Sequence, residues 1–261
     1  MGFLTAYCTD KGIRKTTNQD ALLIKIADTS VGEIAFICVC DGMGGLQKGE
    51  LASSMVIKRL SKWFEKELPD LLSMENRGKE ICQSLKKVIL QENAQISRFG
   101  ESRGIKLGTT LTGMLVIGEE YFVVHIGDTR LYEIGTTIRQ ITEDQTLVNK
   151  EVEMKRLSKI DAEKDPRRSI LLQCVGASPK LEPDFLTGIF HQQAIYMICC
   201  DGFRHEITSE EILQGFRPQL LQNEESMYEQ CRHYIEINKS RMEKDNITVV
   251  LLGRDMEDRY A

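Results

Sequence analysis

The 261-residue sequence contains no apolar run that approaches the roughly 20 residues of a membrane-spanning helix. Its start lacks a basic stretch followed by a long apolar one, so we expect neither a signal peptide nor membrane insertion. The chain also lacks a basic stripe and has a net charge of −5, which disfavours nucleic acid as a partner. We therefore expect a cytoplasmic protein, and its 41% of hydrophobic residues allows a sizeable core.

The sequence also lacks cysteine pairs with the spacing of a metal site. The chain has eight cysteines, but no Cys-x-x-Cys pair, and most of them lie inside apolar runs. This placement favours free buried thiols over disulfides or a zinc site, and it suits a reducing compartment. The GxSxG, HExxH and GxxxxGK[ST] motifs are absent as well, which argues against three common hydrolase classes.

Short segments rich in Val, Ile, Thr and Tyr recur along the chain and predict strands. They are Leu22–Ile26, Glu33–Cys40, Thr110–Ile117, Tyr121–Ile126, Arg130–Ile134, Ile138–Ile141, Ala194–Cys200 and Ile247–Leu252. Three short connections, Gly118-Glu-Glu120, Asp128-Thr129 and Gly135-Thr136, have the length of hairpin turns and predict antiparallel pairing.

Apolar residues at helical spacing predict two long helices, over Glu50–Phe64 and Lys79–Phe99, each with one buried face. A similar pattern from Met227 to Asn238 predicts a helix before the last strand. Strands and helices thus come in separate runs, which indicates the α+β class.

Two further features concern the organisation of the chain. Thr208 and Glu211 have capping-box spacing, which predicts the start of a short helix. The absence of repeats and low-complexity linkers predicts a single domain over residues 1–261. The charged segment around 145–170 is either a mobile flap over a site or a solvated pair of surface helices.

Five aspartates lie where predicted strands begin or end: Asp20, Asp41, Asp128, Asp201 and Asp245. Asp41-Gly42 and Asp201-Gly202 each follow a continuous apolar run, which indicates a buried central strand. A single Asp-Gly pair is more typical of a hairpin turn, where both residues tolerate positive φ. However, Gly42 precedes a predicted helix, and five strand-end carboxylates are hard to explain as unrelated turns.

If these carboxylates converge, their repulsion must either raise their pKa values or be offset by a bound cation. The adjoining sequence predicts oxygen ligands without His or Cys, which favours Mn²⁺ or Mg²⁺ over Zn²⁺. A carboxylate shared by two ions would set them about 3.5–4 Å apart, a spacing that suits in-line displacement at phosphorus. The hypothesis is therefore a dinuclear metal centre, and it depends on convergence of the aspartates.

Seven motifs follow one another along the chain. They are Gly12-Ile-Arg14 with Asn18-Gln19-Asp20, Asp41-Gly-Met-Gly-Gly45 with Gly49-Glu-Leu-Ala-Ser53, Gly108-Thr-Thr110, Gly127-Asp-Thr-Arg130, Thr142-Glu-Asp144, Asp201-Gly202 and Asp245-Asn-Ile-Thr-Val249. In this order they resemble the metal-dependent PPM/PP2C serine/threonine protein phosphatases, and more closely the bacterial branch. The resemblance extends over essentially the whole chain. It implies a β-sandwich of two antiparallel sheets flanked by helices (α-β-β-α), with a metal site at one end.

The resemblance also implies a role for each strand-end residue. Asp41 would bridge two Mn²⁺ or Mg²⁺ ions, and Gly42 would offer its backbone carbonyl to one of them. Asp201 and Asp245 would bind the other ion, and Asp20 would hold coordinated water. Together with Asp201, Asp128 would supply a third ion position.

The implied reaction is direct hydrolysis of phosphoserine and phosphothreonine by a metal-activated water, without a phosphoenzyme. Arg14 would bind the substrate phosphate, because a planar guanidinium can chelate two phosphate oxygens. The alternative for Arg14 is an ordinary surface residue. Phosphorylated proteins, including a Ser/Thr kinase and its substrates, are the expected partners of a monomeric enzyme.

Several positions depart from the family pattern. Met43 stands where eukaryotic relatives often carry a histidine, so the proton donor to the leaving group is unassigned. Leu46, Gln145 and the segment Phe203–Glu206 also differ, which leaves substrate handling open.

Three side chains near these positions have alternative interpretations. Arg204 could favour acidic substrates, but we expect a solvent-facing charge. His205 is expected in an exposed loop, and His125, inside a predicted strand, is expected to be structural. Two other functions compete with catalysis: a catalytically weak relative that serves as a binding module, and a protein whose bound ion is purely structural.

Overall fold

The computed structural model describes residues 2–43 and 48–255, in which groups of strands alternate with groups of helices. The strands are β1 (Phe3–Asp10), β2 (Ala21–Thr29), β3 (Gly32–Cys40), β4 (Leu111–Ile117), β5 (Glu120–Ile126), β6 (Arg130–Ile134), β7 (Ile138–Gln140), β8 (Asp184–Ile189), β9 (Ile195–Cys199) and β10 (Ile247–Arg254). They form two antiparallel five-stranded sheets, ordered β1-β10-β9-β6-β7 and β2-β3-β4-β5-β8.

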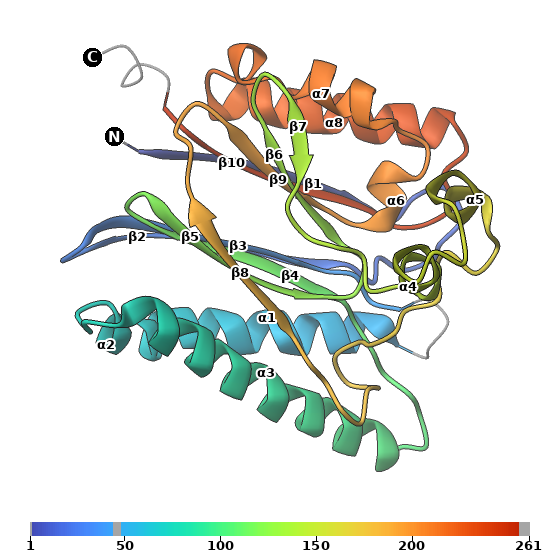
Figure 1. Cartoon of the computed structure of the whole chain (residues 1–261), viewed down its shortest axis with the longest axis horizontal. Helices are drawn as coiled ribbons and strands as arrows, with labels where there is room; N and C mark the ends of the chain where they lie inside the picture. The colour runs from blue at the N-terminus through green and yellow to red at the C-terminus, as the bar shows by residue number, and fades with distance from the viewer. Residues whose placement is uncertain (1, 44–47, 256–261) are drawn as a thin grey trace.

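Helices cover the outer face of each sheet, so the molecule has four layers (Figure 1). The helices are α1 (Gly49–Lys66), α2 (Leu68–Leu71), α3 (Arg77–Glu101), α4 (Leu147–Glu153), α5 (Lys159–Lys164), α6 (Asp201–Arg204), α7 (Ser209–Gly215), α8 (Glu224–Ser240) and the 3₁₀ turn Pro218–Leu220. Figure 1 shows α1, α2 and α3 below the β2-β3-β4-β5-β8 sheet and α7 and α8 above the other sheet. The predicted α+β sandwich is confirmed.

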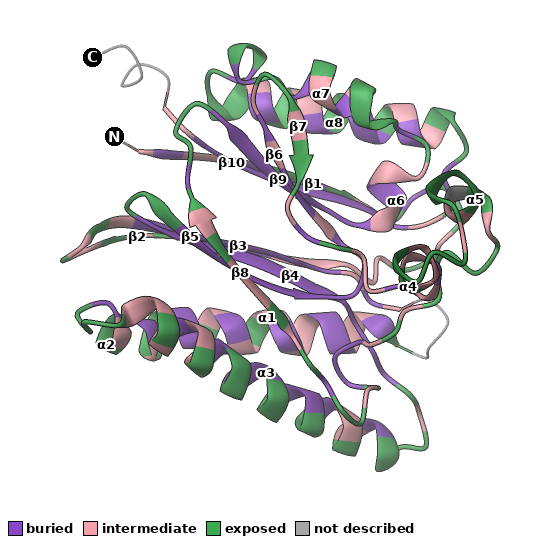
Figure 2. Cartoon of the chain, in the orientation of Figure 1, coloured by how far each residue is buried: buried purple, intermediate pink, exposed green. Residues whose placement is uncertain are grey.

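The central strands are apolar on both sides because each sheet is covered twice, once by helices and once by the other sheet. All seven residues of β4 and all five of β9 are buried (Figure 2). One apolar cluster lies between the two sheets, and a second lies under α1 and α3, where Trp63 is fully buried. The third lies under α7 and α8. This double cover explains why these antiparallel strands read as continuous apolar runs rather than as alternating ones.

Most predicted elements are present, with their ends shifted by a few residues. The capping box of Thr208 and Glu211 is confirmed at the start of α7. The sequence did not predict β1 or β8, which are edge strands with mixed burial patterns. An edge strand pairs on one side only and needs fewer apolar residues, so its sequence signal is weak.

The prediction of a hairpin at Asp128-Thr129 is wrong. Strand β5 belongs to one sheet and β6 to the other, so this connection crosses the sandwich. Gly127 makes the crossing possible with a φ of 101°, in the left-handed region. Hydrogen bonds from Thr112 Oγ1 to the Thr129 carbonyl (3.0 Å) and between the two hydroxyls (2.6 Å) stabilise the crossing.

The segment 145–170 contains α4 and α5, two short helices at the edge of the sandwich (Figure 1). The hydroxyls of Thr146 and Ser158 cap their N-termini. None of the helices in the part of the chain that the structure describes is both long and apolar enough to cross a membrane.

Candidate active site

The strand pairing brings four of the predicted aspartates to one end of the sandwich. Asp41 follows β3, and Asp20 precedes β2, whose first residue pairs with the last residue of β3. Asp201 follows β9, and Asp245 precedes β10, which runs antiparallel to β9. In an antiparallel pair, the end of one strand lies beside the start of the other. The two Asp-Gly segments therefore meet across the sandwich.

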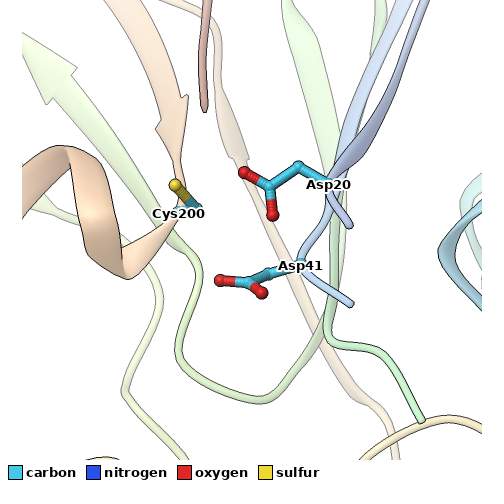
Figure 3. A group of neighbouring side chains, drawn as sticks. All are labelled: Asp20, Asp41 and Cys200. Carbon is cyan, nitrogen blue, oxygen red and sulfur yellow. The ribbon is translucent and has the colours of Figure 1, made fainter. Parts of the chain in front are cut away.

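Asp20 and Asp41 form the centre of this arrangement together with Cys200. One ligand atom from each of the three side chains lies within 4.8 Å of the other two, and Figure 3 shows the two carboxylates side by side with the thiol opposite. The sequence predicted no sulfur here. Cys200 is buried, receives a hydrogen bond from the Thr248 amide (3.1 Å) and donates one to the Asn246 carbonyl (3.4 Å). Its thiol is thus already held by backbone groups.

The carboxylates of this group are poorly compensated. Asp20 Oδ2 accepts a hydrogen bond of 2.6 Å from Thr248, but Asp20 Oδ1 and Asp201 Oδ1 are buried without a partner. Burial, together with the charge of Asp201, raises the pKa of Asp20 to about 7. Burial and the charges of Asp20 and Asp201 raise the pKa of Asp41 well above its usual value. Buried acceptors with this repulsion suit a hard divalent cation.

The backbone around Asp41 is rigidly held. Its amide donates to Thr110 Oγ1 (2.9 Å), and its carbonyl accepts from Thr109 Oγ1 and from the Thr110 amide, both at 2.9 Å. The Gly108-Thr-Thr110 motif therefore anchors the first Asp-Gly segment. An anchored backbone fixes where the Asp41 carboxylate stands before any ligand binds.

The glycines of the Asp-Gly pairs are required by close packing rather than by turns. Gly42 and Gly202 are not among the residues with positive φ. A Cβ on Gly42 would lie 2.5 Å from the Gln19 carbonyl oxygen, and one on Gly202 would lie 2.1 Å from that of Asn246. These contacts contradict the hairpin-turn alternative and pack Asp41 and Asp201 against the strand starts that carry Asp20 and Asp245.

Asp245 has a cation beside it that the sequence analysis missed. Lys15 Nζ lies 2.7 Å from Asp245 Oδ1, with side-chain exposures of 30% and 39%. Burial alone would lower the pKa of Lys15, but the hydrogen bond to Asp245 and the charges of Asp245, Asp41 and Asp201 raise it. One feature of the sequence could have indicated this role of Lys15. It lies next to Arg14, in a loop beside the start of the last strand.

The same loop carries Arg14, whose side chain is exposed. The Asn246 side chain holds this loop by donating to the carbonyls of Lys11 (3.0 Å) and Thr17 (3.2 Å) and accepting from the Gln19 amide (2.9 Å). Arg14 therefore lies in a loop whose backbone Asn246 holds, one residue before the lysine that pairs with Asp245, and it is exposed.

Asp128 has a different environment from the other aspartates. It is 6% exposed, and burial with the charge of Asp201 raises its pKa to about 7, although Arg204 acts against this shift. Arg204 Nη2 donates to the Asp128 carbonyl at 3.2 Å and lies 3.7 Å from its carboxylate. The expectation that Arg204 faces solvent is wrong, because its side chain is only 13% exposed.

The expectation for His205 is also wrong. It is the C-cap of α6, with Nε2 3.5 Å from Asp201 and Nδ1 3.4 Å from Glu243. These contacts outweigh the effect of burial and raise the pKa of His205. In contrast, His125 is structural as predicted, since it bonds Thr112 and the Glu143 carbonyl, both at 2.9 Å.

A cleft of about 1020 Å³ opens beside Asp128. Residues of α4, α5 and α7 line it, with Arg204 and His205 at its inner end. The amide of Met43 donates a hydrogen bond of 3.1 Å to the Gly108 carbonyl. Three further positions lie outside the described residues. They are Gly44 and Gly45, which end the first part of the second motif, and Leu46, which departs from the family pattern.

Residues 11–228 match the family model described as Protein phosphatase 2C. A serine/threonine phosphatase stp of Listeria welshimeri is 33% identical over 223 residues, which are 84% of this chain and 84% of that protein. The protein phosphatase PhpP of Streptococcus pneumoniae is 27% identical over 253 residues, covering 96% of this chain and 97% of that protein.

Two solved structures have a similar fold. The Streptococcus agalactiae serine/threonine phosphatase has a TM-score of 0.82 and 27% identity, covering 97% of this chain and 100% of that one. The catalytic domain of the serine/threonine protein phosphatase PstP, in complex with two manganese ions, has a TM-score of 0.76 and 26% identity. It covers 97% of this chain and 99% of that chain.

Proposed function

Because this chain belongs to the protein phosphatase 2C family, we propose that it hydrolyses phosphoserine and phosphothreonine in proteins by direct attack of water at a centre of two Mn²⁺ or Mg²⁺ ions. The observation that carries the proposal is the group of Asp20, Asp41 and Asp201, which holds two buried carboxylate oxygens without a partner. A buried cluster of like charges needs a cation to be stable in its ionised form.

The residues that would hold the ions are those at the ends of the paired strands. Asp41 and the Gly42 carbonyl would hold one ion, Asp41, Asp201 and Asp245 would hold the other, and Asp20 would hold coordinated water. When bound, such ions lower the pKa of water and offset the charge of the phosphoryl group. Asp20, which lies beside Asp41 in this group, would hold and orient the bound water.

The remaining groups position the substrate and the carboxylates. Arg14, exposed on a loop that Asn246 fixes, would bind the substrate phosphate through its two-pronged guanidinium. His205 has a carboxylate facing each ring nitrogen, so we assign it to orienting Asp201 and not to protonating the leaving group.

We further propose that residues 1–261 form one phosphatase domain in which segment 145–170 is the flap. The cleft between this segment and α7 supports the proposal, because Lys159 and Lys164 on its rim could contact acidic residues near the phosphorylated one. The proposed partners are phosphorylated proteins, including a Ser/Thr kinase and its substrates. The proposed setting is a monomer in the cytoplasm.

The test is turnover of p-nitrophenyl phosphate and of a phosphothreonine peptide, with and without Mn²⁺. Asp201→Asn should abolish the metal-dependent rate. Asp28→Asn is the matched control, because Asp28 is an exposed aspartate near the far end of β2 and should leave the rate unchanged.

The two competing functions give different results. A purely structural ion predicts that Mn²⁺ raises the melting temperature without any turnover. A binding module predicts that phosphopeptide is retained but not hydrolysed. A wild-type rate no higher than that of Asp201→Asn would reject the enzyme.

A further inference from the structure

Arg204 is fixed at the inner end of the cleft by the short helix α6. This helix follows β9 and begins at Asp201, and the amide of His205 closes its turn on the Asp201 carbonyl at 3.0 Å. Phe203 is fully buried, and its carbonyl accepts a hydrogen bond of 2.9 Å from Asn238 on α8. The backbone that carries Arg204 is therefore fixed, and contacts of the guanidinium itself decide where its charge lies.

Three acceptors surround one nitrogen of this guanidinium. Arg204 Nη2 lies 3.2 Å from the Asp128 carbonyl, 3.7 Å from the Asp128 carboxylate and 3.4 Å from Asp144 Oδ2. The side-chain exposures of Arg204, Asp128 and Asp144 are 13%, 8% and 13%. The contact is thus a largely buried charge cluster and not a surface ion pair.

A second arginine already neutralises Asp144. Arg130 Nε lies 2.8 Å from Asp144 Oδ1, and Arg130 Nη2 lies 2.7 Å from Asp144 Oδ2, a two-pronged pair. The positive charge of Arg204 is shared between the carboxylates of Asp144, at 3.4 Å, and Asp128, at 3.7 Å. Two guanidinium groups therefore face the carboxylates of Asp128 and Asp144, although burial and the charge of Asp201 still raise the pKa of Asp128 to about 7. Asp201 and His205 are the other charged or titratable groups that act on Asp128.

We propose that the Arg204 guanidinium takes the place of a third metal ion at Asp128, so that this chain binds two ions where the family resemblance implies three. The inference depends on the proposed two-ion centre, because it concerns only the additional position. A guanidinium does not lose its proton in proteins. A divalent ion on Asp128 would therefore meet a fixed positive charge in a poorly solvated place, or would have to expel it and leave it buried and unpaired.

Lys15 shows why the same argument does not extend to Asp245. Its ammonium makes one contact with that carboxylate, and its side chain is 30% exposed on a flexible four-carbon stem. Lys15 can turn into solvent when an ion binds at Asp245. Arg204 is only 13% exposed and contacts two carboxylates and a carbonyl, so turning it into the cleft would break all three contacts.

The experiment counts Mn²⁺ ions per chain by equilibrium dialysis with elemental analysis at saturating Mn²⁺, alongside the Mn²⁺-dependent shift in melting temperature. Wild type and Asp128→Asn should both bind two ions. Arg204→Gln should bind three, and the double variant Arg204→Gln/Asp128→Asn should return to two. Arg204→Lys, which keeps a positive charge, should stay at two. Arg241→Gln is the matched control, because Arg241 pairs with Glu211 on the surface.

The outcomes separate this inference from the proposed function. Three ions in wild type, with one lost in Asp128→Asn, overturn the role of Arg204 and leave the phosphatase proposal intact. Two ions in a folded Arg204→Gln variant also overturn it. If Arg204→Gln does not fold, the comparison of wild type with Asp128→Asn still decides. No bound ion in any variant rejects the proposed metal centre itself, and this inference with it.

Discussion

Two groups of carboxylates lie at the same end of the sandwich, and their surroundings differ. Asp20, Asp41 and Asp201 gather without a guanidinium among their described contacts, and burial raises the pKa values of Asp20 and Asp41. Asp144 is also buried, but hydrogen bonds from Arg130 and the charge of Arg204 hold its pKa below the usual value. Asp128 shares Arg204 with it. We therefore propose that the cations beside a strand-end aspartate, and not its position alone, decide whether it binds a metal ion.

The cations themselves form a graded series. Arg130 is locked on Asp144 by two short contacts, Arg204 is shared between two carboxylates, and Lys15 touches Asp245 from a partly exposed position. Burial makes a charge pair harder to exchange for another partner. We therefore expect ions to bind readily at Asp41 and Asp201, to displace Lys15 at Asp245, and to be kept from Asp128.

The largest effect should come from the uncompensated group. Asp41→Asn removes the proposed bridging ligand, so kcat/KM with p-nitrophenyl phosphate should fall by more than the roughly 100-fold typical of losing a metal's outer-shell partner. Without metal, the same variant should melt at a higher temperature than wild type, because it relieves buried charge repulsion. A variant that is both fully active and unchanged in stability would contradict the comparison.

Arg14→Ala should give the next largest effect, since it removes the proposed phosphate contact and leaves the carboxylates in place. Hydrogen bonds to charged groups contribute about 1.5–3 kcal/mol, so kcat/KM should fall by roughly 10- to 100-fold. Mn²⁺ affinity should be unchanged, which distinguishes substrate binding from metal binding. Arg77→Ala, which removes an exposed pair with Glu120, provides the control. An unchanged kcat/KM would make Arg14 an ordinary surface residue.

The pH dependence of stability should report the carboxylates with raised pKa values, which are Asp20, Asp41 and Asp128. Asp20 and Asp41 have raised pKa values in the folded state, so they bind protons there that the unfolded chain has released. These groups therefore stabilise the metal-free protein most below about pH 4. Their contribution to the free energy of unfolding is lost as the pH rises through about 7. The raised pKa of Asp20 should lower the melting temperature by about 5–10 °C between pH 5 and 8.

Mn²⁺ should reduce that loss, because an ion takes the place of the protons. Differential scanning calorimetry at several pH values, with Mn²⁺ or with a chelator, measures both effects. A melting temperature that rises between pH 5 and 8 in chelator would show that these carboxylates are not strained by repulsion.

The smallest effect should come from Lys15. Lys15→Ala removes a positive charge that competes with an ion at Asp245, so titration calorimetry should show Mn²⁺ affinity only a few-fold tighter, as expected for a partly exposed pair worth about 1 kcal/mol or less. Weaker Mn²⁺ binding in Lys15→Ala would mean that Lys15 supports the site and does not compete for it.

Much of this arrangement could be predicted from the sequence, because it depends on strand ends. The continuous apolar runs before Asp41 and Asp201 marked central strands, and the antiparallel register then brings Asp20 and Asp245 beside them. The edge strands β1 and β8 were missed because half-exposed strands have mixed patterns. The crossing at Asp128 was missed because a short connection between two sheets has the length of a hairpin.

The charged neighbours could not be predicted in the same way. Arg204 and His205 follow Asp201 within one short helix, and nothing in their spacing shows that they turn inward. Lys15 reaches Asp245 across more than two hundred residues of sequence, and only the tertiary fold brings the pair together. The apolar pattern predicts only that Cys200 ends a strand, whereas its thiol faces the carboxylates (Figure 3).

Anomalous diffraction at the manganese edge, from crystals soaked in Mn²⁺, tests the central claim most directly. The account predicts two peaks that share Asp41, flanked by Asp20 and Asp201, with Lys15 turned away from Asp245 and no peak at Asp128. The absence of any peak at Asp41, or a peak at Asp128 with Arg204 still in place, would contradict it.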